Sequence, residues 1–385
     1  MEEKVKQRWF FVIYFLVYLA QAFSFCLMVT YLISLGYSAT ERSIMFAFGA
    51  ITGIIVQFWF GYLCDKNKTI KRYINYSFIC YSLMTLAVYL TGFRNFFMHI
   101  LLVGTMQIFF RVNIGLVDSW VLESGDYLKD NFGSMRAFGS LGWVVGSYFV
   151  SRMVEKVGYS YIGIVFASIL LIAYFVGKKI PDAQKQQSVK LKLSDVNILF
   201  ENKRYILLIV ILFAIYMVQT SLDYVLPDKL NALNATETEV SYYWMITGLV
   251  ELPLFFAGNK LAKKYGYVNL MILSIVVYGA RFVMYSLSTS ILQVMLISLL
   301  QLFTFPIMQV VSKQLVDKES PENLKSSGQQ IGAALYNCTS ALFSPLLAGV
   351  LEDNFDIDVA LLAISGFALI SLLLTFVYKK KQVEA

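Results

Sequence analysis

The chain has 385 residues, of which 58% are hydrophobic and 15% are charged, with a formal net charge of +7. Soluble domains carry about a quarter charged residues, so this composition excludes an ordinary soluble protein and indicates a membrane protein. The basic residues gather in short connections between apolar stretches. That pattern is typical of membrane topology and of contact with anionic lipid, and it argues against a nucleic-acid-binding surface.

Apolar stretches long enough to cross a bilayer recur along the chain, from Phe10 to near Tyr378. About 20 helical residues are needed to cross roughly 30 Å of hydrocarbon, and the alternating polarity of transmembrane strands is not visible. We therefore predict an all-α membrane protein with about twelve transmembrane helices. The predicted spans are residues 9–34, 43–64, 73–93, 97–122, 133–153, 160–177, 205–226, 240–261, 267–286, 290–312, 327–350 and 357–378.

The first predicted span is too long for the core of a signal peptide, and no small-residue cleavage pattern follows it. We expect it to be a helix of the mature protein. Lys and Arg gather on alternate connections, at residues 4–8, 66–72, 178–204, 260–264 and 379–381. By the positive-inside rule this side is the cytoplasm, so we expect a multi-pass protein of the cytoplasmic membrane with both termini in the cytoplasm.

One long polar connection, from Gly177 to Arg204, divides the predicted spans into two equal sets. It predicts an N-terminal six-helix bundle at residues 1–178, a cytoplasmic linker at 179–204 and a C-terminal six-helix bundle at 205–385. A glycine followed by a basic cluster recurs at corresponding places in the two halves, in the stretches that begin at Gly61 and Gly258. Duplicated halves with a substrate site near the midplane are a common plan of secondary transporters.

Charged side chains occur inside several predicted spans. A charge at the bilayer centre costs about 2.5–3.5 kcal/mol on insertion scales, so it usually faces a partner or a watery cavity. Arg111 and Asp118 are seven residues apart and share a helix face. Asp118 lies near the end of its span and Arg136 near the start of the next, so we expect these two to meet at similar depth. The full set is Arg111, Asp118, Arg136, Asp223, Glu251 and Arg281.

The stretch "GYLCDKNKTIKR", from Gly61 to Arg72, resembles the signature loop of the major facilitator superfamily, with Asp65 as its acid. The usual second glycine and arginine of that loop are replaced here by Lys68 and Ile70. The resemblance implies the major facilitator fold. It also implies a gating loop on the cytoplasmic side that includes Gly61, Asp65 and Arg72.

Two further stretches resemble one particular group within this superfamily. "FGSMRAFGSLGW", residues 132–143, is similar to the fifth helix of the lactose permease, the oligosaccharide:proton symporters and their phenylpropionate-permease-like relatives. "SVKLKLSDVNILFENKRYILL", residues 188–208, resembles the domain linker of the same group and the start of its seventh helix. The resemblance covers nearly the whole chain.

In the lactose-permease group an acid and an arginine hold sugar hydroxyls while a tryptophan stacks on the pyranose ring, and the resemblance assigns these roles to Asp118, Arg136 and Trp143. A carboxylate and a guanidinium each bind hydroxyls at fixed angles, and an indole face covers the C–H side of a sugar. Alternatively, Arg136 and Asp118 only pair across two helix ends, and Trp143 is a packing or interfacial residue. Further candidates to line the site are Arg111, Asn113 and Gln301.

The C-terminal half carries the candidates for proton coupling. Asp223 and Arg281 match charged positions of the permease, and we expect them to pair across the cavity. Glu251, in "GLVELPLFF", forms a Glu-x-Pro arrangement that resembles the phenylpropionate-permease-like relatives. Desolvation favours the neutral form of a buried carboxyl group, so Glu251 is suited to load and release a proton near neutral pH.

The helix that handles protons in that group departs from its pattern here. The histidine and the glutamate expected on it are replaced by Gln301 and Thr304, and neither side chain titrates. Either the proton moved to Glu251, Asp223 or Asp118, or coupling was lost. Because an acid inside the membrane is costly and so implies a use, the sequence favours relocation.

The sequence therefore predicts a monomeric secondary transporter that imports a sugar or other hydroxylated small solute together with protons. An exporter of drugs or sugars, an uncoupled facilitator and a non-transporting receptor remain as alternatives. The four cysteines lack metal-ligand spacing, and no catalytic triad, phosphate loop or HExxH motif is visible. We expect no enzymatic activity, no metal, no cofactor and no nucleic-acid partner.

Overall fold

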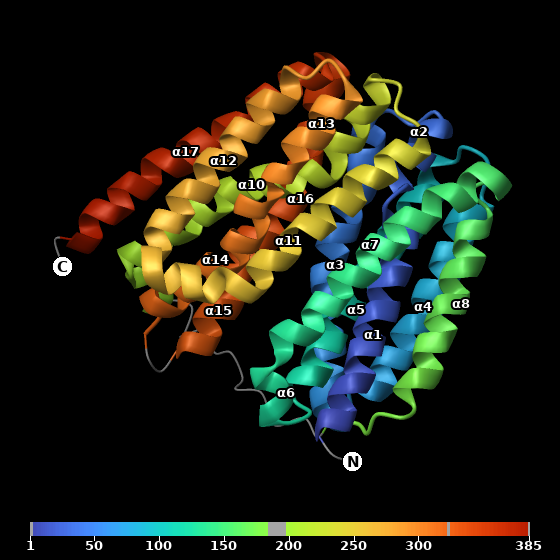
Figure 1. Cartoon of the computed structure of the whole chain (residues 1–385), viewed down its shortest axis with the longest axis horizontal. Coiled ribbons are helices and arrows are strands. Elements are labelled where there is room, and N and C mark those ends of the chain that lie inside the picture. The colour runs from blue at the N-terminus through green and yellow to red at the C-terminus, as the bar shows by residue number, and fades with distance from the viewer. Residues whose placement is uncertain (1–2, 184–197, 322–323, 384–385) are drawn as a thin grey trace. The chain divides into compact units, whose positions relative to one another are not determined.

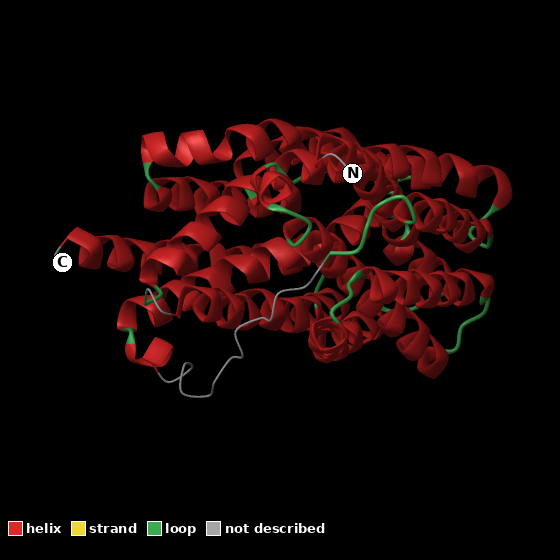
Figure 2. Cartoon of the chain, turned by 90° about the horizontal axis from the view of Figure 1, so that it is seen from below, coloured by secondary structure: helices red, strands yellow, loops and turns green. Residues whose placement is uncertain are grey.

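The computed structural model describes residues 3–183, 198–321 and 324–383 (Figure 1). Within these ranges the regular structure is helical and contains no strand (Figure 2). When short breaks are counted as parts of one segment, the helices in the described ranges, apart from the five-residue helix Asp126–Asp130, match the twelve predicted spans one to one. The predicted all-helical fold is confirmed.

The helices before residue 178 follow one another with short connections. Two of them begin at a capping side chain: Ser38 Oγ accepts the backbone N–H of Glu41, whose carboxylate accepts the N–H of Ser38, and Asn95 Oδ1 accepts the backbone N–H of Met98. The Ser38 cap explains why the helix Ala39–Asn67 begins before the apolar span predicted at residues 43–64. The bounds are α1 (Glu3–Phe25), α2 (Met28–Ser34), α3 (Ala39–Asn67), α4 (Lys71–Leu90), α5 (Phe96–Leu122), α6 (Asp126–Asp130), α7 (Phe132–Val157) and α8 (Tyr161–Gly177).

The helices after residue 202 are less regular. The tenth segment changes to a 3-10 turn and the eleventh to a π-helical turn within its length. The bounds are α10 (Lys203–Ala232), α11 (Glu237–Tyr265), α12 (Tyr267–Ser286), α13 (Ile291–Ser298), η1 (Leu299–Phe303), α14 (Phe305–Glu319), α15 (Lys325–Ala333), η3 (Ala334–Cys338), α16 (Thr339–Asn354) and α17 (Ile357–Val383).

Within the described ranges, nine segments are long and apolar enough to cross a membrane by length and composition. The other three segments are α7, α8 and α11. Helix α8 is apolar but only 17 residues long, whereas α7 and α11 contain the charged residues Arg136 and Glu251 in their spans.

Contacts group the residues into two compact units. The first contains residues 1–188 and 234–252, and the second contains residues 189–233 and 253–385. Helix α11 therefore belongs to the first unit up to Leu252 and to the second from Pro253. The division into bundles at 1–178 and 205–385 stays a prediction, and residues 184–197 of the predicted linker lie outside the described ranges.

In the first unit, α1 packs along α7 and α8, α3 packs on α5, and α4 packs on both α5 and α8. Small residues on α7 allow the approach to α1. A Cβ atom added at Gly142 would lie 2.2 Å from the carbonyl oxygen of Phe15, and one at Gly146 would lie 2.7 Å from that of Leu19. The backbones of α1 and α7 are therefore in direct contact, which places the side chains of α1 next to Arg136.

In the second unit, α10 packs on α16 and α17, and α12 packs on α14 and α17. The break between η1 and α14 occurs at Thr304, which has φ −112° and ψ −90°. Its carbonyl oxygen accepts a hydrogen bond from Ser274 Oγ at 3.1 Å. Irregular backbone at membrane depth needs such partners because lipid offers none.

Candidate substrate site

Arg136 stands at the centre of a charged cluster in the first unit. It lies in the second turn of α7, and its guanidinium carbon is 4.3 Å from the ring centre of Tyr18 on α1. The carboxylates of Asp118 on α5 and Glu251 on α11 are close enough to interact with it electrostatically. We call Tyr14, Tyr18, Asp118, Arg136 and Glu251 the Arg136 cluster.

Asp118 is held from α1 and not only by the arginine. Tyr14 Oη donates a hydrogen bond to Asp118 Oδ1 at 2.6 Å, and Tyr14 is fully buried. Short hydrogen bonds to a carboxylate are among the stronger ones in proteins. Stacking on Tyr18 uses none of the five N–H donors of the Arg136 guanidinium. The arrangement thus orients an acid and a base while leaving the arginine able to bind hydroxyl groups.

Four aromatic side chains gather beside the Arg136 cluster, and we call them the aromatic cluster. Trp143 on α7 and Trp244 on α11 have ring centres 5.9 Å apart, and Phe25 on α1 lies 6.1 Å from the first and 5.6 Å from the second. Phe110 on α5 lies 5.4 Å from Phe25. Trp143 follows Arg136 by seven residues, about 10 Å along the helix, which is the length of a small ring-containing solute.

A glycine opens the space for the Trp143 indole. A Cβ atom at Gly248 of α11 would lie 3.1 Å from Trp143 Cδ1, closer than an ordinary van der Waals contact. Trp244, Gly248 and Glu251 lie four and three residues apart, so they share one face of α11. This face supplies one member to each cluster.

Three buried polar atoms around the clusters lack a hydrogen-bond partner among the described residues. They are Tyr18 Oη, Gln21 Oε1 and Trp244 Nε1. Leaving a buried donor or acceptor unpaired costs about 1–3 kcal/mol, so native proteins rarely do so without a purpose. Two of these atoms are on α1 and one is on α11, and they give the site a hydroxyl, a carbonyl acceptor and an N–H donor.

The α1 residues of this site are not predicted from the sequence. Tyr14, Tyr18, Gln21 and Phe25 lie four, three and four residues apart, which puts them on one helix face. The signal is a stripe of polar-tipped side chains in an otherwise apolar span. Tyrosines are so common in this chain, 25 in all, that the stripe does not stand out from the aromatic background.

Two predicted substrate residues lie elsewhere on α5. The Asn113 side chain is fully buried, its Oδ1 accepts from Ser77 Oγ at 2.9 Å, and its Nδ2 donates to the Phe109 carbonyl at 2.8 Å. The Asn113 amide is therefore held in the packing between α4 and α5, and its role in substrate binding stays a prediction. The side-chain stem of Arg111 lies against Gly53 of α3, and a role for Arg111 in binding stays a prediction.

Arg281 organises a separate polar network in the second unit. It is fully buried, and its Nη1 donates to Gln301 Oε1 and to Thr304 Oγ1, the latter at 2.8 Å. Its Nη2 donates to Tyr285 Oη at 3.0 Å. Gln301 and Thr304 are the two positions at which the resemblance leads one to expect a histidine and a glutamate. Here they hold the guanidinium, and the predicted pairing of Arg281 with Asp223 stays a prediction.

The predicted gating loop is a tight turn between two helices. Gly61 and Asp65 lie in the last turns of α3, and Arg72 lies in the first turn of α4. Lys68 ends α3 with φ +51° and ψ +37°. This is the left-handed conformation that favours glycine, so the turn keeps the backbone shape although Lys68 stands where the signature has a glycine.

The segment after α8 stabilises this turn through hydrogen bonds. The Asp182 carboxylate accepts the backbone N–H groups of Ile70 at 3.1 Å and Lys71 at 3.0 Å, and the Thr69 hydroxyl also donates to it. An acid at the start of a helix satisfies otherwise unpaired N–H groups. Asp182 therefore caps α4 from a distant part of the chain, which the sequence pattern does not reveal.

Comparisons with known proteins agree with this architecture. The model of the MFS_1 like family matches residues 8–363. The maltose permease of Geobacillus stearothermophilus is 22% identical over 294 residues, 76% of this chain and 74% of that protein. The xanthosine permease of Escherichia coli strain K12 is 23% identical over 347 residues, 84% of this chain and 82% of that protein.

Solved structures show the same fold. A crystal structure of a point mutant of the nucleoside transporter NupG has a TM-score of 0.86 and 14% identity, and it covers 97% of this chain and 99% of that chain. A transporter of the POT family has a TM-score of 0.77 and 10% identity, covering 97% of this chain and 96% of that chain. The predicted major facilitator fold is thereby confirmed. The chain belongs to the MFS_1 like family and is a multi-pass integral membrane transporter of small molecules, not an enzyme.

Proposed function

We propose that this protein imports a ring-shaped, hydroxylated solute, a sugar or a nucleoside, together with protons. The observation that carries the proposal is the adjacency of the Arg136 cluster and the aromatic cluster within one unit. The names of the relatives, a maltose permease and a xanthosine permease, support a solute with several hydroxyl groups and a ring.

The Arg136 cluster binds the polar groups of the solute, and the aromatic cluster binds its apolar face. Asp118 accepts hydrogen bonds from hydroxyl groups and Arg136 donates to hydroxyl oxygens, which fixes the polar edge of the solute. The indoles of Trp143 and Trp244 cover its apolar face. The buried Trp244 Nε1 then donates to a ring or hydroxyl oxygen, and the penalty for leaving this donor unpaired disappears on binding.

Glu251 is the proposed proton carrier because it shares Arg136 with Asp118. When Glu251 is ionised, two carboxylates compete for one guanidinium. Protonation of Glu251 removes its negative charge, so more N–H groups of the Arg136 guanidinium can bind the solute. Solute binding and proton binding then favour each other, which is the coupling that symport requires.

Transport by the purified protein in proteoliposomes tests this function. We expect labelled maltose or xanthosine to accumulate when the side carrying the basic connections is alkaline and the opposite side is acid. Arg136→Lys should abolish accumulation because an ammonium lacks the planar donor fork. Arg152→Lys is the matched control: Arg152 lies on the same helix and stacks on the ring of Tyr148 at 3.7 Å, outside the cluster.

Several outcomes would contradict the proposal. Equal transport by the Arg136→Lys and Arg152→Lys variants would remove Arg136 from the site. Extrusion under the same gradient would identify an exporter. Equilibration without accumulation would identify an uncoupled facilitator, and the absence of flux of any solute under any gradient would favour a receptor.

A further inference from the structure

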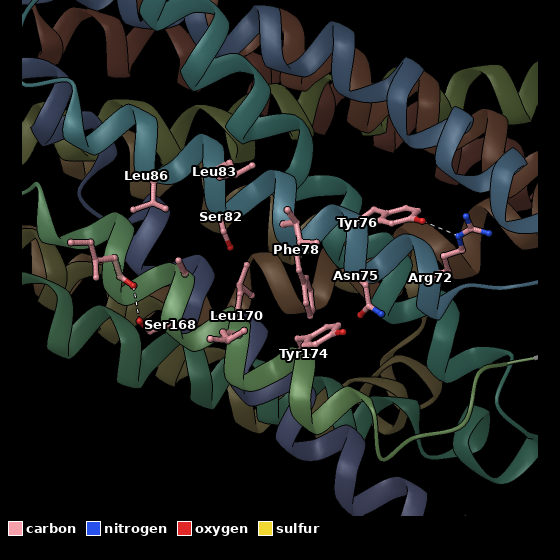
Figure 3. Close-up of a pocket in the computed structure, with 14 residues that line it drawn as sticks. Arg72, Asn75, Tyr76, Phe78, Ser82, Leu83, Leu86, Ser168, Leu170 and Tyr174 are labelled. Carbon is pink, nitrogen blue, oxygen red and sulfur yellow. Dashed lines mark hydrogen bonds between the residues drawn. The ribbon is translucent and has the colours of Figure 1, made fainter.

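A groove with a volume of about 820 Å³ runs between α4 and α8 on the first unit (Figure 3). Its floor is formed by the buried side chains of Phe78 and Leu170, and its rims are formed by exposed apolar side chains such as Leu83 and Leu171. Ligand sites in proteins typically enclose about 300–1,000 Å³. The groove is large enough for a ligand, and the proposed transport site uses none of its residues.

One end of the groove is closed by helix contact. A Cβ atom at Gly163 of α8 would lie 2.7 Å from the Cα atom of Leu86 on α4, so the two backbones touch there. The lining continues from Leu86 to Arg72 at the start of α4, about 21 Å at 1.5 Å per residue. One leaflet contributes about 15 Å of hydrocarbon. The groove therefore spans one leaflet and ends at the helix ends that carry the basic connections.

Two cations stand at that end, each placed by a tyrosine of the groove wall. Arg72 Nε donates to Tyr76 Oη at 3.0 Å on α4. Lys178 Nζ lies 4.7 Å from the ring centre of Tyr174 on α8. Arg72 and Lys178 are both exposed, whereas the neighbouring Lys71 ammonium donates to the carbonyl oxygens of Lys178 and Ile180 and faces the protein.

We propose that this groove binds one anionic diacylglycerophospholipid. Its phosphate sits between Arg72 and Lys178, and one acyl chain follows Phe78, Leu83 and Leu170 toward Gly163. Asn75 and Tyr174 project into the space between the helices near the charged end (Figure 3), where they contact the glycerol region. Tyrosine is typical of the membrane interface because its ring is apolar and its tip is polar, so the order of side chains along the groove follows the order of groups along a phospholipid.

The positive charges of Arg72 and Lys178 at one end of the groove favour an anionic lipid as its occupant. A zwitterionic lipid gains less from two cations than an anionic lipid does, because its own headgroup cation is repelled by them, and a detergent tail needs no cation at all. Each juxtamembrane Lys or Arg strengthens binding of an anionic lipid by roughly fivefold. Arg72 lines the groove, and the Lys178 ammonium lies beside Tyr174 of the opposite wall. Cations placed at both walls therefore distinguish a bound anionic lipid from general attraction to an anionic surface.

Native mass spectrometry of the purified full chain tests the proposal. Added dioleoyl phosphatidylglycerol is expected to bind as one tight adduct, and dioleoyl phosphatidylcholine is not. Lys178→Ala and Arg72→Ala should each weaken the phosphatidylglycerol adduct roughly fivefold. Lys179→Ala is the matched control, since Lys179 is the adjacent exposed cation but its ammonium lies over the ring of Trp9 on α1, 4.4 Å from the centre, whereas the Lys178 ammonium lies beside Tyr174 of the groove lining.

A second pair of variants tests the acyl chain. Leu83→Trp fills the middle of the groove and should weaken the adduct severalfold, whereas Leu90→Trp, on the same helix face beyond the lining, should not. Equal effects of Lys178→Ala and Lys179→Ala, equal binding of the two lipids, or wild-type binding by Leu83→Trp would each overturn the proposal. Since Lys178 and Lys179 are both exposed, that comparison stands even if Leu83→Trp does not fold.

Discussion

Tyr14 on α1 and Asp118 on α5 are joined by a hydrogen bond of 2.6 Å between the phenol and the carboxylate. The phenol is fully buried, and the bond crosses from the first helix to a helix that packs mainly against α3 and α4. It fixes the acid of the Arg136 cluster independently of Arg136. The cluster is therefore organised from two sides, by the Tyr14 hydroxyl and by the Tyr18 ring.

Tyr14→Phe should weaken solute binding and destabilise the protein. The substitution removes a hydrogen bond to a charged group, worth about 1.5–3 kcal/mol, and with it the contact by which α1 orients the Asp118 carboxylate. Tyr81→Phe is the control, because Tyr81 Oη and Ser24 Oγ are 2.6 Å apart in an equally buried but uncharged hydrogen bond. Thermal unfolding in detergent and the KM for uptake check this. Equal KM values for both variants would show that the Tyr14 bond is only structural.

Gly142→Ala should destabilise the first unit. The added Cβ would lie 2.2 Å from the Phe15 carbonyl oxygen, so α1 and α7 must separate. Overpacking of this kind typically costs about 1–3 kcal/mol. Gly133→Ala, in the first turn of the same helix, meets no atom within 4 Å and should stabilise the helix slightly, by less than the roughly 0.5–1 kcal/mol typical of a mid-helix glycine. A lower melting temperature for Gly133→Ala than for Gly142→Ala would contradict the packing described for these helices.

Lys68→Gly should stabilise the turn between α3 and α4. Lys68 has φ +51°, and a left-handed backbone costs a residue with a side chain roughly 1–2 kcal/mol. Glycine adopts this conformation readily. Lys66→Gly removes the same charge from the helical last turn of α3 and should destabilise it by about 1 kcal/mol. Opposite shifts in melting temperature are expected, and shifts of the same sign would show that charge and not backbone conformation decides.

Most of the fold was predictable because hydropathy over about 20 residues reports crossing of the membrane directly. The residues that form the site are less predictable from the sequence. Periodicity tells which residues share a face of one helix, but not which face a neighbouring helix presents to them. The sequence predicts that Asn113 lines the site, but it does not reveal that the Asn113 amide accepts a hydrogen bond from Ser77 of α4. The sequence gives no sign of Trp244 for the same reason, since its place in the site depends on the nearness of Trp143 on another helix.

Gln301→Leu should destabilise the second unit by removing an acceptor from buried Arg281. A buried charge that loses a partner costs about 3–5 kcal/mol when the pair is tight, and the remaining contacts to Thr304 and Tyr285 reduce this penalty. Gln293→Leu is the control, because Gln293 is exposed on α13 and accepts only local bonds from Thr289. Chemical unfolding measures both. Equal stability of the two variants would mean that Gln301 does not support Arg281.

Glu251→Gln should separate proton movement from solute movement. An amide cannot take up a proton near neutral pH, and it removes one of the two negative charges beside Arg136. The variant should therefore exchange labelled for unlabelled solute at a normal rate but fail to accumulate it under a pH gradient. Glu239→Gln serves as the control, because the Glu239 carboxylate is bound to Thr236 at the exposed start of α11. Accumulation by Glu251→Gln at the wild-type level would place the coupling acid elsewhere, with Asp118 and Asp223 next to be replaced, because each is an acid inside a transmembrane helix.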